Sequence, residues 1–129
     1  MLVDFKLLSD SSKLWVFQSN KIISPSNQKF LINEISTFLN DWSSHGAEIK
    51  SSFEIRYDLF LIVSVDEEIN SASGCSIDKL TNFMIHLSNE IGVDFFNRLK
   101  PEQSCVFFAC SVHLFAVVYR LNCSSFNIF

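Results

Sequence analysis

The stretch that decides the fold reads IKSSFEIRYDLFLIV, residues 49–63. From Ile49 to Tyr57 polar and apolar residues alternate, which predicts a strand with one face exposed to water. From Leu59 to Val63 every residue is apolar, which predicts a strand buried on both faces. We therefore expect an edge strand and a central strand, joined by a hairpin turn at Tyr57-Asp58.

A second apolar run, Leu14 to Phe17, lies upstream of this hairpin and predicts another strand covered on both faces. Ser24 and Pro25 follow it as an N-cap and a first helical residue. Apolar residues then recur at helical spacing up to Gly46, which predicts a helix that stops at this glycine. These apolar residues are Leu31, Ile35, Phe38, Leu39 and Trp42.

Downstream of the hairpin, a loop of small residues leads into a second amphipathic helix that Gly92 ends. Ser76 is its expected N-cap, and Asp78 is expected in the first turn, where the helix dipole favours an acid. The apolar residues at helical spacing are Ile77, Leu80, Phe83, Met84, Leu87 and Ile91.

These elements follow one another in the order β-α-β-β-α, and the apolar stretch from Cys105 to Tyr119 is a candidate for a last strand. We therefore predict a single α+β domain over residues 1–129, with the ferredoxin-like split β-α-β (β-α-β-β-α-β) sheet and two helices on one face. Because the helices cover one face only, we expect the C-terminal segment, a second copy of the chain or another protein to cover the other face.

The segment 101–129 is atypical because Glu102 and Arg120 are its only charged residues. One interpretation is one or two buried strands. A second is a C-terminal membrane anchor, although the run is shorter than the roughly 18 apolar residues of a membrane helix. A third is a truncated or frame-shifted C-terminus, for a reason given below.

Composition argues against several classes of function. The net charge is −4 and the ten Lys and Arg are scattered, so nucleic-acid binding is not expected. The N-terminus lacks the pattern of a secretory signal, so we expect a cytoplasmic protein with its four cysteines as thiols. No CxxC pair or zinc-ligand spacing is present, and no metal or cofactor is expected.

The predicted topology places the loop after the first helix and the loop before the second helix at the same end of the sheet. Cys75 lies beside a helix N-terminus, which favours a thiolate nucleophile, and His45 is its candidate general base. The alternative is structural: Cys75 fills a small gap, and His45 interacts with the end of the first helix. The loop also suits a small anion, and its expected binding residues are Trp42, Gly46, Asp66, Glu67, Ser73, Gly74 and Ser76.

Five segments resemble a known family: Leu14 to Asn20, Phe38-Leu39 with Trp42 and His45-Gly46, Ser52 to Ile55, Val65 to Glu67, and Ala72 to Asp78. With SGCSID as the most distinctive stretch, the chain resembles a family of small uncharacterised proteins from Bacteroidetes. Automated labelling often calls them ABC transporter ATPases. The resemblance covers residues 1–99, and family members look longer and more polar beyond it, which implies an altered C-terminus here.

The family label implies ATP hydrolysis, but Gly46, Gly74 and Gly92 are the chain's only glycines and do not form a Walker A loop. We therefore do not expect ATPase activity. We predict a non-enzymatic intracellular module, dimeric, that binds a small anion or a protein at the His45/Cys75 end. The alternative is a thiol-dependent enzyme or redox sensor with Cys75 as nucleophile and His45 as base.

Overall fold

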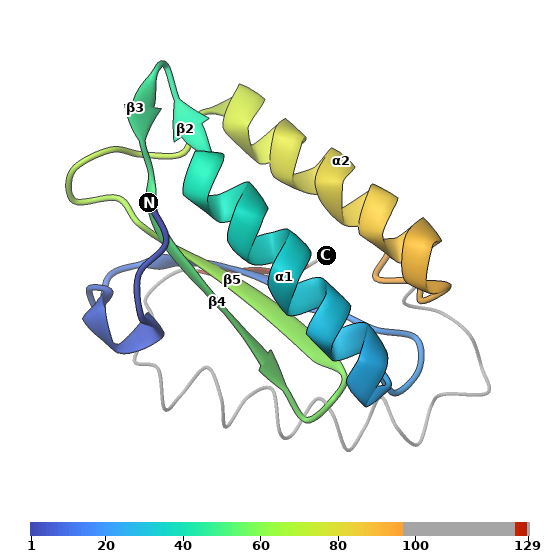
Figure 1. The fold of residues 1–129 in the computed structure, drawn as a ribbon. Coiled ribbons are helices and arrows are strands. Elements are labelled where there is room, and N and C mark those ends of the chain that lie inside the picture. Colours follow the sequence, from blue (N-terminus) through green and yellow to red (C-terminus); the bar gives the residue numbers. More distant parts are fainter. Residues whose placement is uncertain (97–125, 129) are drawn as a thin grey trace.

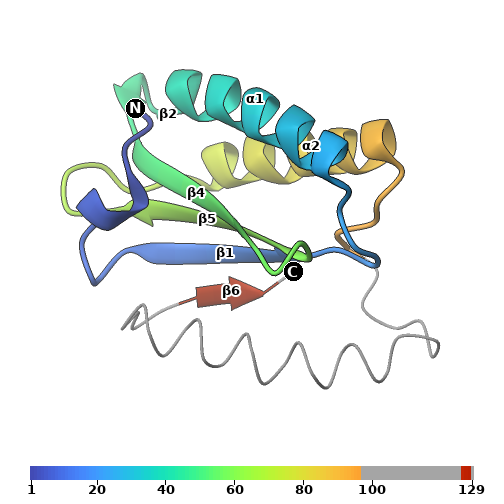
Figure 2. The same ribbon diagram turned by 60° about the horizontal axis from the view of Figure 1, so that its bottom comes forward.

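The structure is a computed structural model that describes residues 1–96 and the backbone of residues 126–128. Its main sheet has the strand order β4-β5-β1-β6, and two long helices lie side by side on one face of it (Figures 1 and 2). The described part of the chain is therefore α+β, as predicted. The elements are the 3-10 helix η1 (Phe5–Leu7), β1 (Lys13–Gln18), α1 (Pro25–Asp41), β2 (Ser43–Ser44), β3 (Ala47–Glu48), β4 (Lys50–Arg56), β5 (Phe60–Asp66), α2 (Gly74–Ile91) and β6 (Phe126–Ile128).

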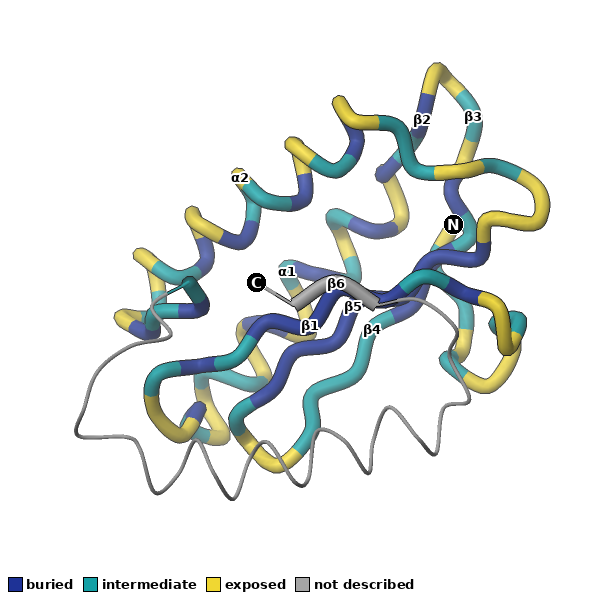
Figure 3. The backbone as a smooth tube through the Cα atoms, turned by 180° about the vertical axis from the view of Figure 1, so that it is seen from behind, coloured by how far each residue is buried: buried dark blue, intermediate teal, exposed yellow. Residues whose placement is uncertain are grey.

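The hairpin of β4 and β5 confirms the two strands and the turn predicted from residues 49–63, but the prediction that one face of the first strand is exposed to water is wrong, because no residue of β4 is exposed and Ser52 is buried. The two strands pair antiparallel from Lys50 opposite Asp66 to Arg56 opposite Phe60. Tyr57 and Asp58 form the turn, with positive φ angles of 55° and 56°. As expected, β4 is an edge strand while β5 is central, and Figure 3 shows β1 and β5 buried along most of their length.

The last strand differs from a ferredoxin-like sheet. β6 pairs parallel with β1, with Leu14 opposite Phe126. A single helical crossover after β5 would return a strand parallel to β5, and because β5 is antiparallel to β1, that strand would be antiparallel to β1. The ferredoxin-like arrangement is therefore not confirmed. The strand predicted between Cys105 and Tyr119 lies outside the described residues.

Helix α1 begins as the sequence predicts but ends earlier. Ser24 is its N-cap, with its hydroxyl accepting the N–H of Asn27, and Pro25 is its first residue. The helix ends at Asp41, so the prediction that it continues to Gly46 is wrong. The next residues form the short β2–β3 hairpin, whose turn is His45-Gly46 with φ angles of 52° and 79°. His45 therefore does not lie at the end of a helix.

Helix α2 begins three residues earlier than predicted. Its N-cap is Ser73, whose hydroxyl accepts the N–H of Ser76, so the prediction of Ser76 as the cap is wrong. Asp78 consequently lies beyond the first turn. At the other end Gly92 is the C-cap in the left-handed conformation, with φ of 66°, as the sequence predicts.

Most of the core lies between the helices and the sheet. Trp15, Phe17 and Leu61 are among its fully buried side chains, and α1 packs on α2 through Phe38 and Phe83, whose rings stack 4.2 Å apart. A smaller apolar cluster lies on the opposite face, with Phe5 and Leu59 packed against it, and consists of Leu14, Val16, Phe60 and Ile62.

Each of these four side chains is about 1% exposed within one copy of the chain. The prediction that the C-terminal segment covers this face concerns residues 101–129, which lie outside the described residues apart from the backbone of β6. The suggested C-terminal anchor lies outside them as well. None of the helices in the described ranges is long and apolar enough to cross a membrane.

Candidate functional site

The end of the molecule that the sequence singles out is built where the β2–β3 hairpin meets the start of α2 (Figure 1). Trp42 connects the two: its indole N–H donates to the backbone carbonyl of Ser76 at 2.9 Å, in a buried position. The indole also packs edge-on against Trp15, with ring centroids 6.4 Å apart. Trp42 is therefore a structural anchor of this end, because its polar atom is already satisfied inside the protein.

The serines of the SGCS loop are also bonded within the protein. The Ser76 hydroxyl donates to the carbonyl of Ser43 at 2.9 Å, and the hydroxyls of Ser73 and Ser76 lie 2.8 Å apart. The backbone N–H of Ser73 donates to the Ser44 hydroxyl at 3.2 Å. These bonds fix the start of α2 against the hairpin, and they turn both predicted binding hydroxyls inward.

Cys75, Gly74, His45 and Gly46 lie on the surface of this end. Within residues 1–96, no hydrogen bond or ion pair joins Cys75 to His45. The same residues contain no cluster of three or more His, Cys, Asp or Glu side chains able to hold a metal ion. The arrangement thus presents an exposed thiol on a helix and an exposed imidazole on a hairpin tip.

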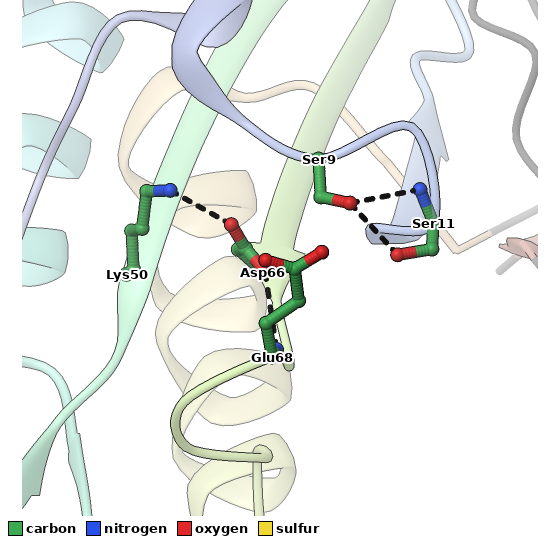
Figure 4. A network of polar contacts seen from close by, with 5 residues as sticks. All are labelled: Ser9, Ser11, Lys50, Asp66 and Glu68. Atoms are coloured by element: carbon green, nitrogen blue, oxygen red, sulfur yellow. Dashed lines mark hydrogen bonds and ion pairs between the residues drawn. The ribbon is translucent and has the colours of Figure 1, made fainter.

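The two acids assigned to this end are held by lysines of the sheet. Asp66 is buried, and its carboxylate accepts from Lys50 at 2.8 Å and from the backbone N–H of Glu68 at 3.1 Å (Figure 4). The hydrogen bond from Lys50 is the largest cause and lowers the pKa of Asp66; burial acts in the opposite direction, and the backbone at Glu68 and Ser9 adds smaller contributions that lower the pKa further.

Glu67 is paired with Lys13 at 3.7 Å, and both side chains of this pair are about one-third exposed. In the described part of the chain neither Asp66 nor Glu67 is bonded to His45: Asp66 pairs with Lys50 of β4, and Glu67 pairs with Lys13 of β1. The structure therefore brings together Trp42, Ser73 and Ser76 through hydrogen bonds, and it separates the two acids into ion pairs of their own.

The feature of this end that remains available to a ligand is the first turn of α2. The backbone N–H groups of Gly74 and Cys75, at the first and second helical positions, have no hydrogen-bond partner in the described part of the chain. A side chain added at Gly74 would meet open space. Free N–H groups at the positive end of a helix of 18 residues suit a small anion.

Sequence reasoning missed a second group of polar residues, on the sheet face opposite the helices. Ser52 and Ser64 are paired across β4 and β5, and both are buried beside the N-terminal segment. The sequence does carry a signal for this group, because polar residues occupy every second position of β4. That alternation alone predicts a face exposed to water. Strand pairing was needed to recognise that Ser64 of the buried strand lies on that face too.

Comparison with known proteins provides no relative: the chain matches no protein-family model, and no curated protein or solved structure matches it with significance. The resemblance to the Bacteroidetes family therefore stays a prediction.

Proposed function

We propose that this protein is a non-enzymatic binding module whose binding end is formed by His45 and Cys75 with the first turn of α2. The observation that carries the proposal is the pair of backbone N–H groups at Gly74 and Cys75, two exposed residues in the first turn of α2 without hydrogen-bond partners in the described part of the chain. A small anion such as phosphate or a carboxylate is the ligand that these donors suit.

The bonding of the neighbouring side chains supports binding over catalysis. A nucleophile and its base need to lie within hydrogen-bond reach, and the base needs an orienting partner. No hydrogen bond joins Cys75 to His45 in the described part of the chain, and Asp66, an acid of the predicted site that could have oriented the imidazole, is bonded to Lys50. The serine hydroxyls at this end are bonded to the protein, which leaves backbone donors as the groups available to a ligand.

The proposal is tested by titrating the protein with inorganic phosphate and following backbone amides by NMR. The informative variant is Gly74→Pro, because proline is tolerated at the first helical position and removes the N–H. Ser73 before it is extended, with ψ of 165°, as a residue before proline must be. We expect phosphate to shift the amides of Cys75 and Ser76, and Gly74→Pro to weaken this binding several-fold.

Gly74→Ala is the matched control, since it keeps the N–H and its methyl group meets open space. It should bind phosphate as the unaltered protein does. If both variants bind equally, or if phosphate leaves the start of α2 unshifted, the proposed binding end is wrong.

The alternative function is a thiol-dependent enzyme or redox sensor, and the exposure of Cys75 at the second helical position favours it. A helix N-terminus stabilises a thiolate. The rate of alkylation by iodoacetamide as a function of pH distinguishes the two functions. A midpoint well below the pKa of about 8.5 of an ordinary thiol, moved upward by His45→Ala, would support the enzyme. An ordinary midpoint supports the binding module.

A second copy of the chain or another protein is the macromolecular partner that we propose. Several large apolar side chains on the outer surfaces of the helices support it, among them Ile32 at 49% and Ile85 at 44% exposure. Light scattering on the purified chain tests self-association, and a monomeric mass would leave another protein as the partner to be found.

We also propose that the fold of this chain is a variant of the ferredoxin-like domain. The β-α-β-β-α order of the long elements and the central positions of β1 and β5 support it. The parallel pairing of β6 with β1 is the feature that distinguishes this fold from the standard ferredoxin-like sheet.

A further inference from the structure

A cleft of about 550 Å³ lies between the N-terminal segment and the sheet face opposite the helices. Phe5 and Leu8 of the N-terminal segment line one side of it, and Ser52 and Ser64 of the sheet line the other. This volume falls within the range of small-molecule sites in proteins. The cleft is separate from the His45/Cys75 end, since none of that end's residues line it.

The N-terminal segment is attached to the sheet on both sides of the cleft. At its start, the N–H of Val3 donates to the carbonyl of Ser51 at 2.9 Å, and the N–H of Ser51 donates to the carbonyl of Met1 at 3.0 Å. At its other end, the segment continues directly into β1, which pairs with β5 from Lys13 opposite Val65. Because both sides are bonded to the sheet, the cleft is preformed.

Polar side chains with no hydrogen bond to the described part of the chain line this cleft. Ser52 is 3% exposed and Ser64 is 1% exposed, and neither hydroxyl has a hydrogen bond to another residue of the described ranges. Arg56 also lines the cleft, and its Nε is buried without a partner while its Nη2 donates to Glu54. Buried polar groups in proteins are almost always bonded, so the unpartnered Nε of Arg56, beside the two serine hydroxyls that line the same cleft, indicates that a ligand supplies the missing partner.

The charges around the cleft restrict the ligand. Lys6 and Arg56 are positive, whereas Asp4, Asp10 and Glu54 are negative, and all five line the cleft. An anion would face the three carboxylates and a cation would face the two positive groups, so neither charge is favoured. A neutral ligand with hydroxyl groups avoids both conflicts, because hydroxyls donate to carboxylates and accept from Arg56 and the serines.

We propose that this cleft binds a neutral polyhydroxylated small molecule of about monosaccharide size. Its hydroxyl groups bond Ser52, Ser64 and the Nε of Arg56, and its apolar face packs on Phe5 and Leu14. The proposal is independent of anion binding at the start of α2, because the two sites share no residue.

The test is an NMR titration of the whole chain with D-glucose, and separately with sodium acetate and methylammonium chloride. We expect glucose to shift the amides of Ser52, Ser64 and Phe5, and the two ions to leave them unchanged. Concentrations up to about 100 mM are sufficient to saturate a site with a millimolar Kd. Absence of these shifts with glucose, shifts confined to the start of α2, or binding of an ion in its place would each overturn the proposal.

The variant that tests the contacts is Ser52→Ala combined with Ser64→Ala. Both hydroxyls lack partners in the described protein, so their removal should leave the fold intact, as the dispersion of the NMR spectrum will show. We expect glucose affinity to fall at least tenfold, and Arg56→Lys, which removes Nε but keeps the charge, to lower it as well. Ser71→Ala, in an exposed loop away from the cleft, is the control. Equal glucose affinity in all these variants would contradict the proposed site.

Discussion

The two faces of the sheet are filled in different ways. On the face beneath α1 and α2, large apolar side chains such as Trp15, Phe17 and Leu61 form one continuous core. The opposite face has a small apolar cluster around Val16 and, beside it, serines, a cleft and the ion pair of Lys50 with the buried Asp66. The comparison teaches that burial of both faces does not make them equivalent: one face stabilises the fold, and the other also holds polar groups.

The largest effect should come from truncating the helix-covered face. Trp15→Ala removes a fully buried ring that contacts Trp42, and it should lower the free energy of unfolding by about 3–5 kcal/mol. The neighbouring Val16→Ala, on the opposite face, should cost about 1–2 kcal/mol because it removes less buried volume. Urea denaturation measures the free energy of unfolding of both variants. Equal losses would contradict the inference that the helix-covered face contributes more to stability than the opposite face.

The next largest effect concerns the ion pair on the opposite face. Lys50→Met leaves the Asp66 carboxylate, which is 3% exposed, without its cation, whereas Lys50 itself is about one-quarter exposed. Water partly screens such a pair, so we expect a loss of about 2–3 kcal/mol rather than the full value for a buried pair. In the Asp66→Asn background, Lys50→Met should cost less. The same cost in both backgrounds would show that the pair does not act as a unit.

Acid should weaken the same face. The folded state lowers the pKa of Asp66 below its ordinary value of 3.8, mainly through Lys50. The stabilisation is therefore complete above this ordinary value, and it is lost as the pH falls through the lowered pKa of the folded state. Thermal unfolding measured from pH 6 downward should show this loss, and Asp66→Asn should reduce the pH dependence. An unchanged dependence in the variant would assign the acid sensitivity to other groups.

A smaller effect is expected at the start of α2. Ser73→Ala removes the N-cap and should cost about 1 kcal/mol. Ser76→Ala removes the bond to the Ser43 carbonyl and should cost a similar amount, although Ser76 is no cap. Helix content of α2 followed by NMR distinguishes the two: fraying of the first turn is expected with Ser73→Ala and not with Ser76→Ala. The opposite result would restore Ser76 as the cap.

The smallest effect should be a gain. His45 and Gly46 form a hairpin turn with positive φ at both positions, and Asn-Gly is the pair that this geometry prefers. His45→Asn should therefore raise the stability by about 0.5 kcal/mol, since asparagine adopts the left-handed conformation more readily. A loss of stability would indicate that the imidazole makes a contact that holds the hairpin. The variant Cys75→Ser serves as a control on the same end.

The strands and the start of α1 were predictable because their signals are local. Alternation in β4, continuous apolar runs in β1 and β5, and the Ser24-Pro25 pair all act within a few residues of the chain. The β2–β3 hairpin was missed because two-residue strands have no periodicity to detect, and Trp42 also fits the helical spacing of α1. The sequence predicted the candidate site only in part. Trp42, Ser73 and Ser76 are joined by hydrogen bonds, whereas Asp66 and Glu67 pair with lysines of the sheet.

Within residues 1–96, the sequence by itself determined the type and order of the long strands and helices and the central position of β1 and β5, because side-chain periodicity is set by the geometry of each helix or strand. The tertiary structure decided which serine caps α2, which lysine neutralises Asp66 and where a cleft remains. These outcomes depend on partners that are distant in the sequence, such as Ser43, 33 residues from Ser76, and Lys50, 16 residues from Asp66. Several serines and lysines are equally suitable by type, and only the register of the strands and the packing of the helices select among them.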